Sequence, residues 1–162
     1  MGAKMKDYFW KAQDAENKRK YKKAFKYYLK GDELGDLGCT LNAGYCFHCG
    51  QGVKRNLGKA IEYYTKCVDG GYAVGASNLG MLYLERNDLE RAKEYLLKAI
   101  AMGDKSAAVD IANIYNKEGN FIDAKYFYEM VLNFEPGTIM EAAIEEAQEN
   151  LKELAKRCNN LI

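Results

Sequence analysis

The feature that most constrains the fold of this chain is an alanine followed four positions later by a large residue, repeated four times. The alanines are Ala24, Ala60, Ala92 and Ala124, and the large residues are Tyr28, Tyr64, Leu96 and Tyr128. The intervals between alanines are 36, 32 and 32 residues. A fixed period in this range is typical of stacked helical pairs, because one such pair cannot bury its apolar face alone. The period therefore predicts an array of helix-turn-helix repeats.

A second set of positions repeats upstream of the first. Small residues stand at Ala12, Gly44, Gly80 and Ala112, at intervals of 32, 36 and 32 residues. Three positions after each of them come Ala15, Phe47, Tyr83 and Tyr115. Small residues let two helices approach closely, and large residues fill the space beside them. The two sets together predict four repeats, each with a first and a second helix.

The motifs within these repeats resemble a known family. Asn78–Tyr83 with Ala92, and Asp110–Tyr115 with Gly119, Ala124 and Pro136, resemble tetratricopeptide repeats. The segments Asn42–Phe47, Gly50–Val53 and Lys59–Ala60 resemble the Sel-like variant, whose longer turn accounts for the interval of 36. The resemblance covers roughly residues 5 to 138. It implies an all-α, right-handed α/α solenoid of about four helix-turn-helix repeats with a C-terminal capping helix, acting as a non-enzymatic adaptor.

The predicted domain organisation follows from this register. We expect a repeat array over residues 1–138, with repeats at about 5–36, 37–72, 73–105 and 106–138, and a cap at 139–162. Thr138 and Glu141 have the spacing of a capping box, so the last helix should begin at Ile139. Its apolar stripe is Ile144, Ala147, Leu151, Leu154 and Cys158, opposite an acidic stripe that stays in water. Helices are expected at about 5–17, 20–33, 38–48, 56–69, 74–86, 89–102, 106–117, 121–133 and 139–158.

Composition agrees with a single globular domain. The chain has 162 residues, of which 48% are hydrophobic and 29% charged. No run of 18 apolar residues occurs, and lysines are spread through residues 1–30, so neither a membrane span nor a signal peptide is indicated. The five cysteines are irregularly spaced, and the third and fourth repeats contain none, which argues against the repeat disulfides of secreted Sel-like proteins. We expect a cytoplasmic location.

The pair Cys46 and Cys49 is the most suggestive chemical motif. Tetrahedral zinc normally needs four ligands, and the one histidine, His48, lies between the two cysteines. Neighbouring helical residues do not face each other, so His48 is not placed to activate either thiol. Cys46 has the register of Leu82 and Ile114, which predicts a packing role. The sequence leaves open whether Cys39, Cys46, Cys49 and Cys67 have a role beyond packing, and a small metal or redox protein that uses Cys46 and Cys49 is the third alternative.

Catalytic chemistry finds little support elsewhere. With one histidine and two serines, Ser77 and Ser106, the chain shows no nucleophilic triad. Residues 52–59 imitate a phosphate-binding loop, but they follow a helix and are followed by Ala60 where a serine or threonine should hold magnesium. The long Sel-like turn explains the same residues. We expect no catalytic residue, no metal and no cofactor.

The basic stretch from Lys18 to Lys30 holds seven basic residues and no acidic one. We interpret it as a solvated helix face whose buried side is Tyr21, Ala24, Phe25, Tyr28 and Leu29. The alternative function is a nucleic-acid-associated or acidic-ligand protein that uses this basic face. No base-reading motif accompanies the stretch.

The preferred functional interpretation is a groove that binds a protein or peptide partner. In stacked helical pairs the first helix of each repeat lines the concave side, so exposed positions recur once per repeat. Asparagine amides there can hold an extended backbone, and large apolar side chains offer adaptable contacts. Taking the positions two before and one after each small residue, the predicted groove is Trp10, Gln13, Asn42, Tyr45, Asn78, Met81, Asp110 and Asn113.

Overall fold

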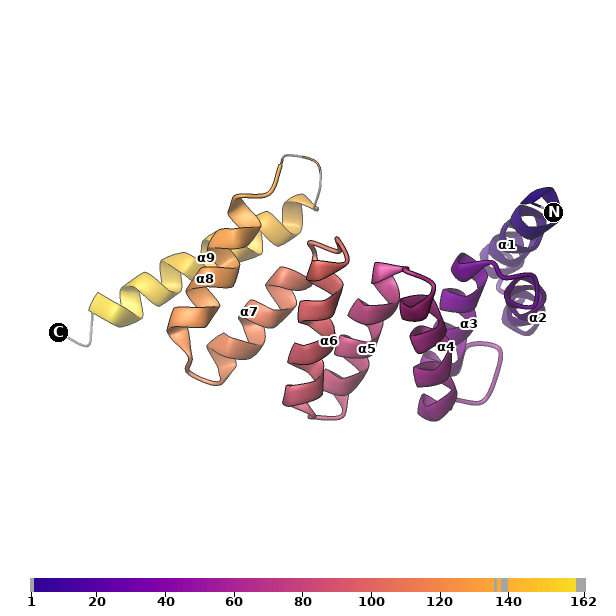
Figure 1. Cartoon of the computed structure of the whole chain (residues 1–162), viewed down its shortest axis with the longest axis horizontal. Coiled ribbons are helices and arrows are strands. Elements are labelled where there is room, and N and C mark those ends of the chain that lie inside the picture. The colour runs from indigo at the N-terminus through magenta and orange to yellow at the C-terminus, as the bar shows by residue number, and fades with distance from the viewer. Residues whose placement is uncertain (1, 136, 138–139, 160–162) are drawn as a thin grey trace. The chain divides into compact units, whose positions relative to one another are not determined.

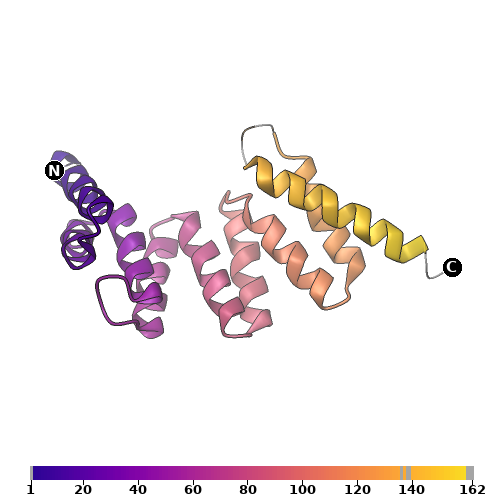
Figure 2. The same cartoon turned by 180° about the vertical axis from the view of Figure 1, so that it is seen from behind.

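The computed structural model describes residues 2–135, 137 and 140–159, with side chains from residue 7 to residue 157. Within these residues the regular structure is entirely α-helical, and the helices are labelled in Figure 1 and seen from behind in Figure 2. Each predicted helix is present, with its ends within three residues of the prediction. The helices are α1 (Gly2–Asn17), α2 (Tyr21–Asp32), α3 (Leu37–Cys49), α4 (Leu57–Asp69), α5 (Ala73–Glu85), α6 (Leu89–Ala101), α7 (Ala107–Lys117), α8 (Phe121–Leu132) and α9 (Glu141–Asn159).

One helix start differs from the prediction. The last helix, α9, begins at Glu141 and not at Ile139, because Met140 is outside the helix. The predicted cap residue Thr138 and the side chain of Cys158 lie outside the described residues. Within the described part, no helix is both long and apolar enough to cross a membrane.

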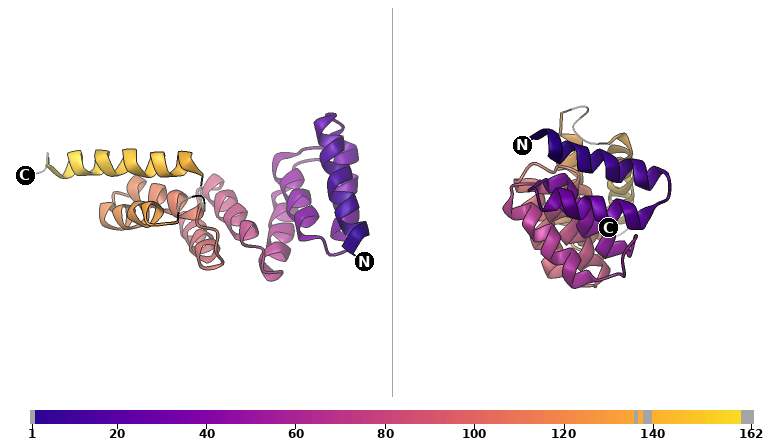
Figure 3. Two further views of the ribbon diagram at one scale, coloured as in Figure 1. Left: turned by 90° about the horizontal axis from the view of Figure 1, so that it is seen from above. Right: turned by 90° about the vertical axis from the view of Figure 1, so that its right-hand side faces the viewer.

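The chain divides into two compact units, residues 1–82 and 83–162, and the boundary falls within α5. In the first unit α1 packs on α2, α2 on α3 and α3 on α4, and α3 also contacts α1. Figure 3 shows α1 and α2 side by side. In the second unit α6 packs on α7, α7 on α8 and α8 on α9, and Figures 1 and 2 show α9 alongside α8 from both sides. Consecutive helices from α1 to α4, and from α6 to α9, therefore pack on one another, as repeats require.

Most residues of the two repeating sets lie in the core, which confirms the register. The alanines and large residues of the second helices are buried, and so are the small residues of the first helices. Gly44 shows why small residues are needed, since a Cβ there would lie 2.8 Å from the ring of Tyr64. The first helix thus presses directly against the aromatic ring of its partner helix. Any larger residue would push the two helices apart.

The second helices of three repeats begin with a side-chain cap at the same register position. Asn56, Asp88 and Asn120 accept a hydrogen bond from the backbone N–H three residues later, at 3.0, 3.3 and 3.3 Å. Such caps satisfy an N–H that the helix itself leaves unpaired. In the first repeat Lys20 occupies this position with a similar backbone and makes no side-chain cap.

The long turn between α3 and α4 leans on the preceding repeat. A Cβ at Gly52 would lie 2.4 Å from the backbone oxygen of Tyr21, and Gly52 has a φ of 76°. Only glycine fits both requirements. Arg55 Nε donates to the carbonyl oxygen of His48 at 2.9 Å, and Val53 packs against the core. The turn is thus part of the packing between repeats, in keeping with a structural and not a phosphate-binding role.

The first and last helices are more polar than those between them. On α1, Asp7, Lys11 and Asp14 are exposed, whereas the register equivalents on α3, which are Cys39, Ala43 and Cys46, are buried. Lys11 pairs with Asp7, and Lys18 with Asp14. On α9, Ala147 and Leu154 are buried, while Glu145, Glu149 and Glu153 are exposed, as the predicted stripes require.

Candidate functional site

The eight predicted groove residues lie on the first helices of the four repeats. Six belong to the first unit: Trp10 and Gln13 on α1, Asn42 and Tyr45 on α3, and Asn78 and Met81 on α5. Asp110 and Asn113 lie on α7, in the second unit. Helices α1 and α3, which carry four of these residues, contact each other.

In the first and fourth repeats, the predicted groove residue directly after the small residue is hydrogen-bonded to a buried tyrosine hydroxyl. These groove residues are Gln13 and Asn113. The Tyr28 hydroxyl accepts from Gln13 Nε2 at 2.8 Å and donates to Glu16 Oε2 at 2.9 Å. Burial, and next the bond to Glu16, raise the pKa of Tyr28. The Tyr128 hydroxyl donates to Asn113 Oδ1 at 2.5 Å. Gln13 and Asn113 are therefore tied to their own repeat, as buried hydroxyls require a partner.

The same position in the middle repeats carries large, exposed side chains. Tyr45 is 49% exposed and Met81 42%, and Trp10 on α1 is 67% exposed. Tyr45 contacts the thiol of Cys49, which is the main cause that raises the pKa of Tyr45. Aromatic and methionine side chains in such positions give adaptable apolar contact area. The first unit thus presents apolar contact groups on each of its three first helices.

The asparagine positions differ between the units. Asn42 Nδ2 donates to the carbonyl oxygen of Gly38, one turn earlier, at 2.7 Å. Asp110 has the same register but carries a carboxylate, and its pKa is raised to about 6 by burial, then by Glu146 and Asp104. Asn113 Nδ2 donates to Glu146 Oε1 at 2.8 Å. In the second unit, therefore, a residue of α9 already contacts the predicted groove positions.

Two polar residues beside the groove were not predicted. Glu16 bonds to Tyr28, and His48 Nδ1 lies 3.3 Å from the Tyr64 hydroxyl. Both lie four positions after the small residue of their repeat. The signal available in the sequence was the tyrosine at a core position, because its hydroxyl needs a polar partner from the paired helix. In the third repeat the equivalent residues are Leu96 and Leu84, and no hydroxyl is present.

The packing role predicted for Cys46 is confirmed by its burial. Cys39, Cys46 and Cys67 are buried, and burial is the main cause that raises the pKa of each thiol to about 12. Such thiols stay protonated at neutral pH and are poor nucleophiles. Cys49 is exposed at the end of α3. Among the described side chains no group of three or more histidine, cysteine, aspartate or glutamate residues is placed to hold a metal ion.

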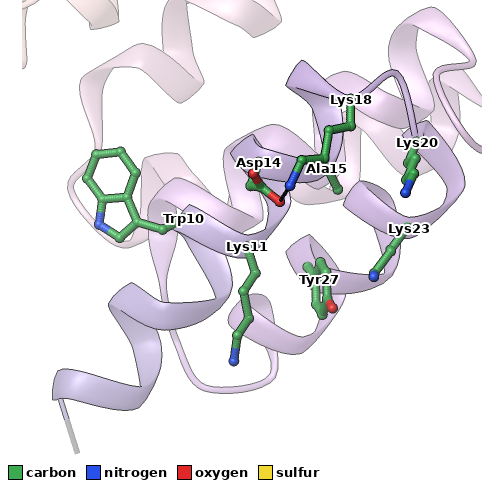
Figure 4. A pocket seen from close by; sticks show the side chains of 8 residues that line it. All are labelled: Trp10, Lys11, Asp14, Ala15, Lys18, Lys20, Lys23 and Tyr27. Atoms are coloured by element: carbon green, nitrogen blue, oxygen red, sulfur yellow. Dashed lines mark hydrogen bonds and ion pairs between the residues drawn. The ribbon is translucent and has the colours of Figure 1, made fainter.

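The basic face of α2 is exposed, as predicted for a solvated face. Tyr21, expected on the buried side, is instead exposed, at the first position of α2. Beside this face lies a hollow of about 320 Å³, and Figure 4 shows Lys11 and Lys23 on either side of the Tyr27 ring. Residues 1–82 contain 14 basic and 8 acidic residues, a net charge of +6, and residues 83–162 contain 10 and 15, a net charge of −5.

Family comparisons agree with the repeats found in the structure. The Sel1 repeat model matches residues 18–36 and 39–72, and a tetratricopeptide repeat model matches residues 77–102. The Sel1 matches include the long turn at residues 50–56. Proteins built from these repeats generally mediate protein–protein interactions.

Solved structures show the same fold at low identity. A Sel1 repeat protein from Oxalobacter formigenes is 24% identical, with a TM-score of 0.57, covering 68% of this chain and 47% of that one. The protective antigen c5321 of uropathogenic Escherichia coli, which displays an SLR fold, is 21% identical, with a TM-score of 0.66 and coverage of 85% and 30%. A MamA protein is 22% identical, with a TM-score of 0.64 and coverage of 96% and 88%. The chain thus spans less than half the length of the first two structures.

The architecture defines a class: an all-α solenoid of helical repeats. Within that class, the matched repeats support a Sel1-like repeat protein of the tetratricopeptide repeat superfamily.

Proposed function

We propose that this protein is a non-enzymatic adaptor that binds a peptide or protein partner on the first helices of its first unit. The proposed surface consists of Trp10, Gln13, Asn42, Tyr45, Asn78 and Met81. Asp110 and Asn113 are left out because Glu146 already contacts Asn113 and raises the pKa of Asp110. The repeat families support a protein partner in general, and the local geometry supports this surface.

One observation carries the proposal: each first helix of the unit exposes a large apolar side chain. Trp10, Tyr45 and Met81 are exposed, while the amides of Gln13 and Asn42 are hydrogen-bonded. Exposed aromatic groups grouped on one surface are typical of binding hot spots. Gln13 and Asn42, whose amides are held by Tyr28 and Gly38, supply fixed polar groups between them. Fixed amides favour an extended backbone, whose N–H and C=O groups they can pair.

The experiment uses a random peptide library, from which peptides that bind the chain are selected. Peptides selected on the purified full chain would be measured for affinity against Tyr45→Ala combined with Asn78→Asp. Loss of an aromatic hot spot of about 2 kcal/mol or more corresponds to a roughly thirty-fold weaker affinity. The helical circular dichroism should stay unchanged, since Tyr45 is half exposed.

The control pair is Lys22→Glu with Lys26→Glu, which reverses two exposed charges on α2. This pair should leave the selected peptides bound. If the lysine pair abolishes binding and the groove pair does not, the first-helix surface is not the site.

The second candidate function is binding of an acidic ligand at the basic face. It is favoured by the hollow beside α2, which is lined by four lysines: Lys11, Lys18, Lys20 and Lys23. Binding there should weaken steeply as salt rises, because cation–anion contacts are screened. Binding of an oligonucleotide pool with a steep salt dependence, lost in Lys20→Glu with Lys23→Glu, would favour this candidate over the adaptor.

A further inference from the structure

The outer face of α8 carries an exposed apolar stripe that the other repeats lack. Ile122 is 84% exposed and Tyr126 58%, and Met130, one turn further, is partly buried. Residues four apart lie on one face of a helix, so these three form a single row. The buried residues of α8, among them Ala124 and Tyr128, lie on the opposite side.

The internal repeats provide the comparison that makes this stripe unusual. At the same three register positions, the other second helices carry only charged residues or glycine. These are Lys22, Lys26 and Lys30 on α2, Gly58, Glu62 and Lys66 on α4, and Glu90, Glu94 and Lys98 on α6. Charged residues are the normal choice for a solvated helix face. An apolar row at this register therefore indicates a contact surface on α8 alone.

The stripe contains both an exposed apolar side chain and, beside it, a hollow. The hollow measures about 300 Å³ and is lined by Tyr126, Glu129, Met130 and Asn133. These residues have the spacing i, i+3, i+4 and i+7, which is the spacing of the four residues that surround an inserted side chain in packed helices. Ile122 projects from the same face one turn earlier.

This arrangement is self-complementary in an antiparallel pair of α8 helices. If two copies are centred on Tyr126, Ile122 of each copy lies opposite the hollow of the other. Lys125 and Glu129 flank the row and form an intrachain ion pair at 3.6 Å. In the antiparallel pair equivalent flanks meet, so Lys125 of one copy lies within one turn of Glu129 of the other. A two-fold interface requires this kind of reciprocal fit.

We propose that a second copy of this chain docks on the α8 stripe and forms a symmetric, antiparallel α8–α8 dimer. Each copy inserts Ile122 into the hollow of the other, and two Lys125–Glu129 pairs border the contact. The row is short compared with a standard interface of about 800 Å² per partner, so the dimer should be reversible and concentration-dependent. It leaves the first-helix surface of the proposed function untouched.

The first test is sedimentation equilibrium of the full chain over a range of concentrations. The unaltered chain should show a monomer–dimer equilibrium. Ile122→Glu should weaken the dimer by about a hundred-fold or more, because two buried isoleucines are lost per dimer. The matched control is Lys26→Glu, which changes charge at the same outer face of another repeat and should leave the dimer unchanged. A chain that stays monomeric, or a dimer that survives Ile122→Glu, overturns the proposal.

The second test reverses the flanking charges. Lys125→Glu alone places two pairs of like charges across the interface, and Glu129→Lys alone does the same with lysines. Each variant should dimerise roughly ten-fold more weakly, since exposed ion pairs contribute little individually. An equimolar mixture of the two variants should restore dimerisation, because each heterodimer regains two opposite-charge pairs. Failure of the mixture to recover excludes the antiparallel arrangement.

The two proposals fail separately. Ile122 and Lys125 lie in the second unit, while the proposed peptide surface lies in the first. Loss of dimerisation in Ile122→Glu with unchanged peptide affinity would support this inference without bearing on the adaptor surface. Peptide affinity that falls in Ile122→Glu would instead show that partner binding uses α8.

Discussion

Asp110→Asn should stabilise the protein at neutral pH and leave its stability nearly unchanged in acid. Asp110 is the register equivalent of Asn42, whose side-chain amide donates to the carbonyl oxygen one turn earlier. An ionised Asp110 has no proton to donate, and burial together with Glu146 and Asp104 disfavours its charge. Asparagine would supply the donor and remove the buried charge.

The magnitude follows from the raised pKa. The ordinary pKa of 3.8 rises to about 6 in the folded protein, so the folded state holds this proton more tightly than the unfolded chain does. The stability gained from the proton is complete below about pH 4 and is lost as the pH rises through about 6. Allowing for solvent screening of a partly exposed carboxyl, we expect a loss of about 1 to 2 kcal/mol, which Asp110→Asn removes.

The assay is thermal unfolding followed by circular dichroism from pH 4 to pH 8. At pH 7.5 the Tm of Asp110→Asn should exceed that of the unaltered chain by about 3 to 6 °C, and the two should converge near pH 4. The control is Asp14→Asn, an exposed aspartate paired with Lys18, which should shift the Tm little at any pH. If the Tm difference between the two proteins is independent of pH, or is absent, then Asp110 is not a carboxyl group whose ionised form destabilises the fold.

Three further substitutions test the packing. Lys20→Asn should add about 1 kcal/mol to the free energy of unfolding, because asparagine caps the second helix in the second and fourth repeats; an unchanged urea midpoint would show that α2 cannot use the cap. Tyr28→Phe should cost about 1 to 2 kcal/mol in urea unfolding, since Gln13 and Glu16 lose their shared partner, and a neutral result would mean that water replaces it. Ala92→Arg should cost on the order of 3 kcal/mol or more by burying an unpaired charge, and an unaltered melting curve would contradict the register.

The sequence by itself determined the repeats, the helices and the core. Small and large residues recur because the same helix crossing is built four times. The buried positions therefore repeat along the sequence at the same interval as the crossings. Ala24 and Tyr28 could be assigned to the core from Ala60 and Tyr64 alone, and all four proved buried. The start of α9 was less predictable, because it depends on a local cap and not on a repeated crossing.

The tertiary structure alone decided which of the predicted groove residues are exposed and which are hydrogen-bonded within the chain. Gln13 and Tyr45 share one register position, but the first is held by Tyr28 while the second is exposed. Asn113 is contacted by Glu146, which is 33 residues away in the chain. The exposure of the α8 stripe is also visible only in the structure. In the sequence, Ile122 has the pattern of one more apolar residue of an amphipathic helix. Periodicity reports which helix face recurs in the core, whereas exposure and hydrogen-bond partners depend on groups that meet only when the chain has folded.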